Sequence, residues 1–152
     1  PETRKNLLTS IYLDAPAQER MNVKLQRKYA KMDKEFQRAE CYQCDDADVV
    51  LLAYGSSSRN ARTVVDMLRT EGIKVGLFRP ITLSPFPIDA LRPLAKKRLF
   101  TVEMSSGQFR DDVVLHLARE GLLPPEGVGL INRMGGMLIP VQDIVRAVKG
   151  AL

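Results

Sequence analysis

Three polar loops carry the residues of this chain that could bind a ligand, and each follows a short apolar run. The first loop is Gly55-Ser56-Ser57-Ser58. Backbone N–H groups and hydroxyls at the start of a helix suit an anion, and Arg59 stands next to them. The loop matches neither the GxGxxG pattern of dinucleotide sites nor the P-loop pattern. The competing interpretation is structural, with one of the serines capping the helix.

The second loop is Glu103-Met104-Ser105-Ser106-Gly107-Gln108, a carboxylate at a strand end followed by a turn of small residues. Glu103 has two interpretations. It is either a polar contact for a ligand or a structural group that caps backbone amides or pairs with Arg79 or Arg133. Gly107 and Gln108 are candidate supporting residues in both cases.

The third loop is Arg133-Met134-Gly135-Gly136-Met137. Gly135 and Gly136 permit positive φ angles and a close approach of the backbone. The two methionines suit an adaptable apolar contact, either at an interface or in a ligand pocket. We predict that this loop, like the other two, supports a site without performing chemistry.

The chain completes no catalytic or metal-binding pattern. Ser105 lacks the G-x-S-x-G elbow of hydrolases, and His116, the single histidine, falls within a helical apolar pattern. Cys41 and Cys44 form a lone CxxC, whereas a zinc site needs two more Cys or His ligands and only His116 is left. We therefore predict no catalytic residue and no metal site, and we interpret the cysteines as reduced thiols.

Strand and helix patterns alternate from residue 47 onward. Helical patterns end near Gly72 and Gly121, and Pro93 should split another. Four apolar runs have the length and composition of strands buried on both faces, namely 49–54, 73–78, 99–104 and 128–131. This order predicts an α/β fold of three α/β/α layers with a mostly parallel, doubly wound sheet. The three loops should then lie at its carboxyl edge.

Residues 1–46 differ from the rest in their pattern of apolar and charged residues. They are predicted to form a linker with a helical arm, before an α/β domain over 47–152. Leu7 and Leu8 begin a short apolar patch near the start. Further on, apolar residues recur on one helical face, and the opposite face is basic; the apolar ones are Met21, Leu25, Tyr29, Met32 and Phe36. Two interpretations stay open for this helix: it packs on its own domain, or it docks on another domain or subunit.

Charge and hydropathy exclude two classes of partner. The 23 Lys and Arg exceed the 18 Asp and Glu, but they are spread along the chain, and no Trp or basic-aromatic cluster accompanies them. We therefore expect no nucleic-acid binding. No apolar run approaches the roughly 18 residues of a membrane helix, and no signal-peptide pattern is present, so we expect a cytoplasmic protein without a membrane partner.

Five ordered motifs resemble the C-terminal, transketolase-C-like domain in the α subunit of 2-oxoacid:ferredoxin oxidoreductases. They are RKNLLTSIYLD at 4–14, DADVVLLAYGSSSRNA at 46–61, EGIKVGLFRPITLSPFP at 71–87, VEMSSGQ at 102–108 and RMGGM at 133–137. The last two look most like the 2-oxoisovalerate (branched-chain) type, and 2-oxoglutarate-type subunits are similar.

The resemblance implies a part in converting a 2-oxoacid and CoA to acyl-CoA and CO2, with electrons passed to ferredoxin. It implies thiamine diphosphate, Mg²⁺ and 4Fe–4S clusters in the complete enzyme and none in this chain. The implied partners are the remainder of the α subunit and a β subunit that holds the thiamine diphosphate and the cluster. The acid that activates the thiamine would lie in a preceding domain, so this chain, as a C-terminal portion, is expected to be inactive by itself.

A second function stays open from the residues alone. The loop Gly55–Ser58 would also suit a stand-alone α/β module that binds a nucleotide or CoA.

Overall fold

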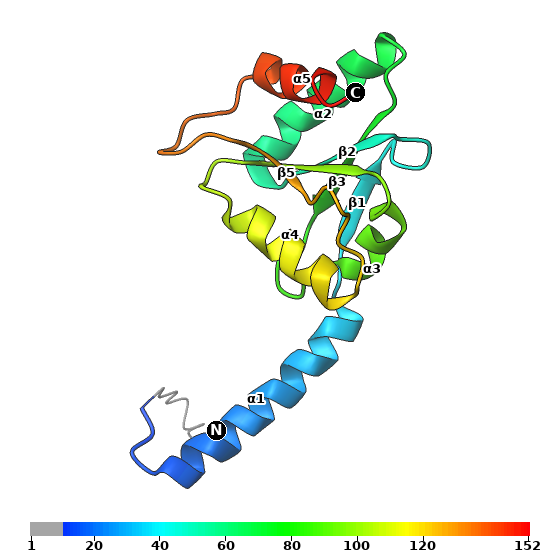
Figure 1. The fold of residues 1–152 in the computed structure, drawn as a ribbon. Coiled ribbons are helices and arrows are strands. Elements are labelled where there is room, and N and C mark those ends of the chain that lie inside the picture. The colour runs from blue at the N-terminus through cyan, green and yellow to red at the C-terminus, as the bar shows by residue number, and fades with distance from the viewer. Residues whose placement is uncertain (1–10) are drawn as a thin grey trace, which may run out of the picture. The chain divides into compact units, whose positions relative to one another are not determined.

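The computed structural model describes residues 11–152, and the chain divides after Glu35 into two units (Figure 1). Helix α1 (Ala15–Glu35) belongs to the first unit, and the α/β fold begins with Phe36 in the second. Leu7, Leu8 and most of the motif at 4–14 lie outside the described residues. Residues 36–46 pack with the α/β unit, while the division into a linker and a domain at 46/47 stays a prediction.

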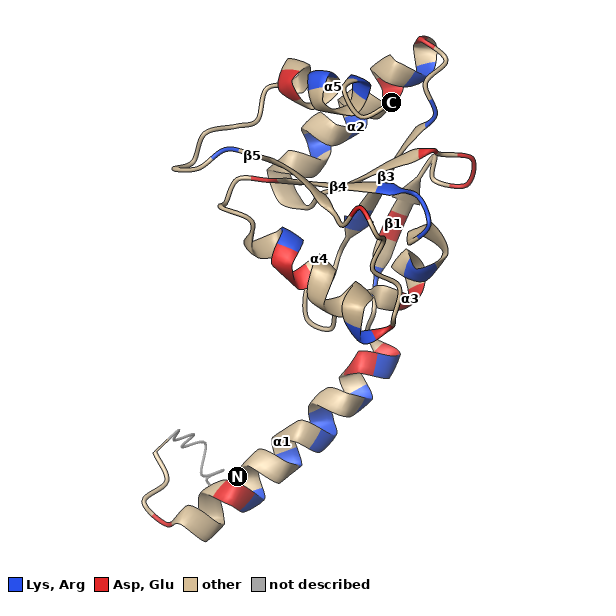
Figure 2. Ribbon diagram, viewed as in Figure 1, with Lys and Arg blue, Asp and Glu red and all other residues tan. Residues whose placement is uncertain are grey.

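Helix α1 is amphipathic, but none of its own residues is buried. Asp14 caps it by accepting a hydrogen bond from the Ala17 N–H at 3.0 Å. Figure 2 shows Lys and Arg along most of the helix. None of its 21 residues is buried, and Tyr29 is 48% exposed. The apolar stripe of α1 is therefore unburied within its own unit.

The second unit is built on a five-stranded sheet in the order β1-β3-β2-β4-β5. Its strands are β1 (Ala39–Tyr42), β2 (Val49–Leu52), β3 (Val75–Pro80), β4 (Arg98–Glu103) and β5 (Gly129–Asn132). Strands β2 to β5 pair in parallel, which confirms the predicted doubly wound sheet. Strand β1 pairs antiparallel with β3 and was not predicted. Its sequence, AECY, lacks the apolar run that marked the other four.

Helices cover both faces of the sheet, as predicted. They are α2 (Gly55–Thr70), α3 (Ile88–Leu91), α4 (Gln108–Arg119) and α5 (Val141–Lys149). Helices α2 and α5 lie on one face and α3 and α4 on the other (Figure 1). Pro93 does split its helix, because α3 stops at Leu91 and a single 3-10 turn follows. Each face has its own buried core, and Leu51 and Phe78 are examples from the two sides.

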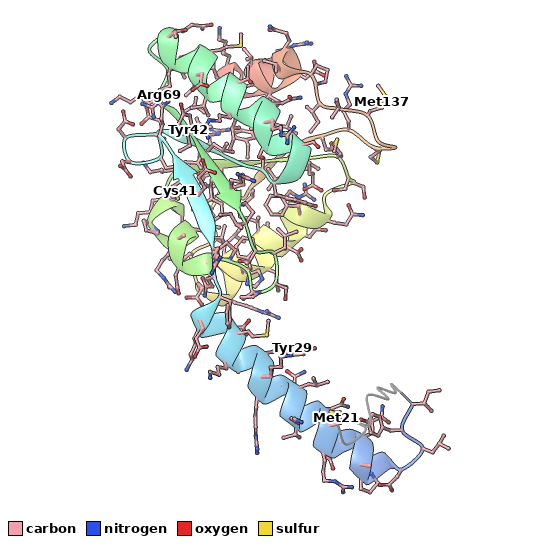
Figure 3. All side chains as sticks on the ribbon, turned by 180° about the vertical axis from the view of Figure 1, so that it is seen from behind. Met21, Tyr29, Cys41, Tyr42, Arg69 and Met137 are labelled. Atoms are coloured by element: carbon pink, nitrogen blue, oxygen red, sulfur yellow. The ribbon has the colours of Figure 1, made fainter. Side chains whose placement is uncertain are left out.

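Arg69 ties the end of α2 to the sheet (Figure 3). Its Nε donates to the Val75 carbonyl at 2.8 Å, and its Nη2 donates to the Gln43 carbonyl at 2.7 Å. The guanidinium also binds both oxygens of Asp46, at 2.9 and 2.8 Å. The hydrogen bond from Arg69 holds the pKa of Asp46 below its ordinary value. One side chain therefore joins the helix, the turn after β1 and the start of β3.

This ion pair predicts a specific acid dependence of stability. Because the pKa of Asp46 is lower in the folded state, its contribution is complete above the unfolded value of about 3.9 and is lost as the pH falls through the folded pKa. Asp46→Asn should flatten the fall of unfolding free energy below about pH 4.5, measured by urea denaturation. Asp45→Asn, at a neighbouring exposed carboxylate, is the control. If the unfolding free energy of Asp46→Asn fell with decreasing pH as steeply as that of the wild type, the ion pair of Asp46 and Arg69 would not be the cause of the acid dependence.

Candidate functional site

The three candidate loops lie at one edge of the sheet. They follow β2, β4 and β5, and parallel strands end on the same side. Asn132 Nδ2 donates to the Ser105 carbonyl at 2.7 Å, which joins the second loop to the third. Asn60 Nδ2 donates to the Ile139 carbonyl at 2.8 Å, which joins the first turns of α2 to the segment that follows the third loop. The structure therefore brings together three segments that are far apart in the sequence.

In the first loop, the expected serine cap is wrong. Tyr54 holds the N-cap position of α2 without a side-chain hydrogen bond, and Gly55 already belongs to the helix with φ +56°. Ser58 is buried and its hydroxyl donates to the Gly55 carbonyl at 2.7 Å, inside the first turn. Ser57 is buried and Ser56 is exposed. The start of α2 therefore keeps its polar N–H groups without a capping side chain.

A cavity of about 470 Å³ adjoins this uncapped helix start. Its lining combines charged and small residues: Glu40, Gly55, Ser56, Ser58, Arg59, Arg62, Leu77 and Arg79. Glu40 bridges two of the arginines, with 3.0 Å from Oε1 to Arg62 Nη1 and 3.0 Å from Oε2 to Arg79 Nη1. Arg62 also lies 4.0 Å above the Tyr42 ring. We call this pocket the arginine cavity.

Three lining residues of the arginine cavity were not predicted as site residues from the sequence, namely Glu40, Arg62 and Leu77. Arg62 could have been found, because it follows Gly55, Ser58 and Arg59 at helical spacing on one face of α2. Glu40 could not have been found from the sequence, because its position beside the arginines depends on the pairing of β1 with β3.

In the second loop, Glu103 acts as a cap for helix α4. Its side chain is 2% exposed. It accepts hydrogen bonds from the backbone N–H groups of Gly107 at 2.9 Å, Phe109 at 3.3 Å and Arg110 at 2.8 Å, and one from the Ser105 hydroxyl at 2.5 Å. Of the interpretations left open, the structure therefore selects amide capping. Arg79 and Arg133 pair elsewhere, with Glu40 and Asp143.

The neighbours of Glu103 complete this turn. Gly107 is the N-cap of α4 and has φ +116°, a conformation that side chains other than glycine rarely adopt. Gln108 Oε1 accepts a hydrogen bond from the Ser106 N–H at 2.9 Å. Both candidate residues therefore shape the loop, and their contacts in the structure are to the loop itself.

The third loop extends from β5 to α5 and projects from the body of the domain (Figure 1). Gly135 and Gly136 have φ angles of +70° and +78°, which turn the chain at its tip. Arg133 pairs with Asp143 at 2.8 Å and anchors the base of the loop to α5. Met137, labelled in Figure 3, is 60% exposed, and Met134 is 62% exposed. The loop thus presents apolar side chains to its surroundings.

The two cysteines are free and poorly suited to nucleophilic chemistry. Cys44 is buried, and this burial is the main cause that raises the pKa of its thiol to about 12. Burial also raises the pKa of the Cys41 thiol. Since the thiolate is the reactive form, both residues are held in the unreactive state near neutral pH. Within residues 11–152, no three His, Cys, Asp or Glu side chains gather as metal ligands would.

The chain is similar to known proteins along most of its length. Residues 47–144 match the family model described as pyruvate:ferredoxin oxidoreductase core domain II. The ketoisovalerate oxidoreductase subunit VorB of Methanothermobacter thermautotrophicus is 48% identical over 97% of this chain and 41% of the relative. The 2-oxoglutarate synthase subunit KorA of Methanocaldococcus jannaschii is 37% identical over 69% of this chain and 27% of that protein.

Solved structures share the fold. A 2-oxoglutarate:ferredoxin oxidoreductase from Magnetococcus marinus, determined with 2-oxoglutarate, coenzyme A and succinyl-CoA bound, superposes with a TM-score of 0.72. It is 22% identical and covers 91% of this chain and 24% of that one. A split-gene transketolase, described as an inactive beta4 tetramer, gives 0.59 at 20% identity, over 76% of this chain and 41% of that one. The expected likeness to transketolase is confirmed for the fold.

The matched relatives are longer than this chain. It spans about two fifths of the VorB relatives, whose names describe them as subunits of an oxidoreductase. No helix in the described part of the chain combines the length and apolar character needed to cross a membrane. The chain belongs to the 2-oxoacid:ferredoxin oxidoreductase family, in the part described as pyruvate:ferredoxin oxidoreductase core domain II.

Proposed function

We propose that this chain is the C-terminal assembly domain of a thiamine-dependent, cytoplasmic 2-oxoacid:ferredoxin oxidoreductase that acts on branched-chain 2-oxoacids. The complete enzyme would convert a 2-oxoacid, CoA and two oxidised ferredoxins to acyl-CoA, CO2 and two reduced ferredoxins. The 48% identity to two ketoisovalerate oxidoreductase subunits supports this substrate class. Its partners would be the rest of the α subunit and a β subunit that carries thiamine diphosphate and an iron–sulfur cluster.

The residues of this chain do not fit the cofactors of such an enzyme. A 4Fe–4S cluster takes four cysteine thiolates, whereas the chain has two cysteines and one of them is buried. Within residues 11–152, no three His, Cys, Asp or Glu side chains gather where they could hold the Mg²⁺ that accompanies thiamine diphosphate. We therefore assign thiamine diphosphate, Mg²⁺ and the cluster to other parts of the enzyme.

The observation that carries the assembly role is the exposure of large apolar side chains in segments that follow three strands at the carboxyl edge of the sheet. Six large apolar side chains, all at least 38% exposed, come from the segments after β2, β3 and β5: Tyr54, Ile81, Leu83, Met134, Met137 and Leu138. We call them the apolar edge. Large apolar patches on a protein surface mark contacts with other proteins. We propose that the apolar edge packs against the preceding domain of the α subunit or the β subunit, beside the cofactor cleft.

The rigid support behind the apolar edge fits this role. Glu103 and Asn132 hold the second and third loops to one another and to α4. Loops fixed in this way can position a neighbouring site without touching substrate, and a displacement of about 1 Å there can cost on the order of 100-fold in rate. Helix α1, whose apolar stripe is unburied within its own unit, would serve as a further strut on another domain or subunit.

The experiment is a pair of substitutions in the complete enzyme. Met137→Asp and Leu138→Asp should each weaken subunit or domain association on the order of 100-fold, because a charge would be placed in an apolar contact. Size-exclusion chromatography and oxidoreductase assays provide the measurements. Leu123→Asp, at an apolar residue that is 40% exposed and away from the apolar edge, is the matched control and should assemble normally.

Two further results would contradict the proposal. One is normal association and activity of both edge variants. The other is turnover of a 2-oxoacid by the isolated chain when thiamine diphosphate, Mg²⁺, CoA and ferredoxin are supplied. The second result would show a self-contained oxidoreductase. A different alternative is a stand-alone module that binds a nucleotide or CoA at Gly55–Ser58. Similarity to larger enzyme subunits over 97% of the chain supports the assembly role instead.

A further inference from the structure

We propose that the arginine cavity binds the phosphate group of a small phosphorylated ligand. The cavity lies between the first two turns of α2 and the edge formed by β1 and β3. Its volume of about 470 Å³ falls in the range of small-molecule sites, which is roughly 300–1,000 Å³. This proposal goes beyond the assembly role and depends only on residues of this domain.

The fold assembles the cavity from three separate segments. Arg59 and Arg62 lie three residues apart on α2, so they share the face that also carries Gly55 and Ser58. Arg79 of β3 stands opposite Glu40 in the register of the antiparallel β1–β3 pair. Leu77, two residues before Arg79, is buried, lines the cavity and belongs to the core cluster that includes residues of α2. The charged groups therefore converge from a helix and two paired strands.

The charge in the cavity is unbalanced. Three arginines face one carboxylate, which leaves an excess of two positive charges. Arg59 takes part in none of the ion pairs among the described residues. The first turn of α2 also contains no acidic residue that would offset the positive end of the helix. A phosphate dianion would match this excess.

The geometry shows that the arginines are spaced for the oxygens of an anion. The two oxygens of Glu40 each receive a guanidinium N–H at 3.0 Å, one from Arg62 and one from Arg79. A planar guanidinium matches phosphate oxygens in the same way as it matches a carboxylate. Glu40 therefore competes with an incoming ligand for the two arginines. Arg59 would supply the third contact.

This competition gives the proposal a distinctive test. Isothermal titration calorimetry of the 152-residue chain with inorganic pyrophosphate, and separately with ADP, should show saturable binding at one site that weakens as salt increases. Arg59→Gln and Arg79→Gln should each weaken binding on the order of 10-fold. Glu40→Gln should strengthen it several-fold, because the competing carboxylate is gone. Arg119→Gln on α4 is the matched control and should bind as the wild type does.

Each outcome decides the question. Equal binding of pyrophosphate and ADP would mean that the cavity recognises the phosphate group alone, and tighter binding of ADP would mean that it also holds a nucleoside. Absence of saturable binding by both probes at low salt overturns the proposal. So does an effect of Arg119→Gln equal to that of Arg59→Gln, or weaker binding in a folded Glu40→Gln variant. The assembly role would survive these results, because no step of the test involves association or turnover.

Discussion

Replacing Glu103 with alanine should lower the free energy of unfolding by about 4 kcal/mol. The carboxylate is 2% exposed and accepts hydrogen bonds from three backbone N–H groups at the start of α4. Removing it leaves buried donors without an acceptor and takes a negative charge away from a helix N-terminus. At about 3 °C per kcal/mol, the melting temperature should fall by about 12 °C.

Glu103→Gln separates the two causes. The amide keeps one acceptor oxygen but turns an NH2 group toward a backbone N–H. The free energy of unfolding of Glu103→Gln should therefore lie between that of the wild type and that of Glu103→Ala. Denaturant unfolding measures the stabilities, and Glu126→Ala, at an exposed carboxylate, is the control. In the complete enzyme, Glu103→Ala should also impair assembly, because the same loop supports the proposed contact surface. A stability of Glu103→Ala within about 1 kcal/mol of the wild type would exclude the capping role.

Replacing Gly76 with alanine should destabilise the domain by about 3 kcal/mol. Gly76 lies in the buried strand β3, and an added Cβ would stand 2.8 Å from the Gln43 carbonyl oxygen and 2.9 Å from the Cys44 Cα. Both atoms belong to the backbone of the turn after β1. Arg69 holds that turn through the Gln43 carbonyl, so the turn cannot move aside without breaking this contact as well.

Gly129→Ala is the matched comparison. There the added Cβ would run into the ring of Phe100, its partner in the register of β4 and β5. A side-chain ring can rotate away, whereas a backbone turn cannot, so we expect a loss of only about 1 kcal/mol. Thermal or urea unfolding of both variants checks the difference. A larger loss in Gly129→Ala than in Gly76→Ala would show that the turn after β1 is freer to move than its contacts indicate.

The candidate site was predictable in its location but not in its contacts. The three loops were expected at one edge because they follow apolar runs, and parallel strands end together. The role of Glu103 was left open between a ligand contact, capping of backbone amides and pairing with an arginine. A serine cap of α2 was one of two interpretations of the first loop, whereas the structure places the serines inside the helix. The sequence shows that Glu103 stands at the end of a strand. Which backbone N–H groups donate to its carboxylate depends on how helix α4 begins.

The sequence by itself determined the four parallel strands, the helices between them, the break at Pro93 and the family. These features depend on local patterns of apolar residues, on proline and glycine, and on ordered motifs, all of which can be read along one segment. Only the tertiary structure decided that β1 joins the sheet, that Arg69 holds its turn, and that Glu40, Arg62 and Arg79 form one cavity. The reason is physical, since β1 has little apolar content of its own and its place is set by hydrogen bonds to β3, about 40 residues away.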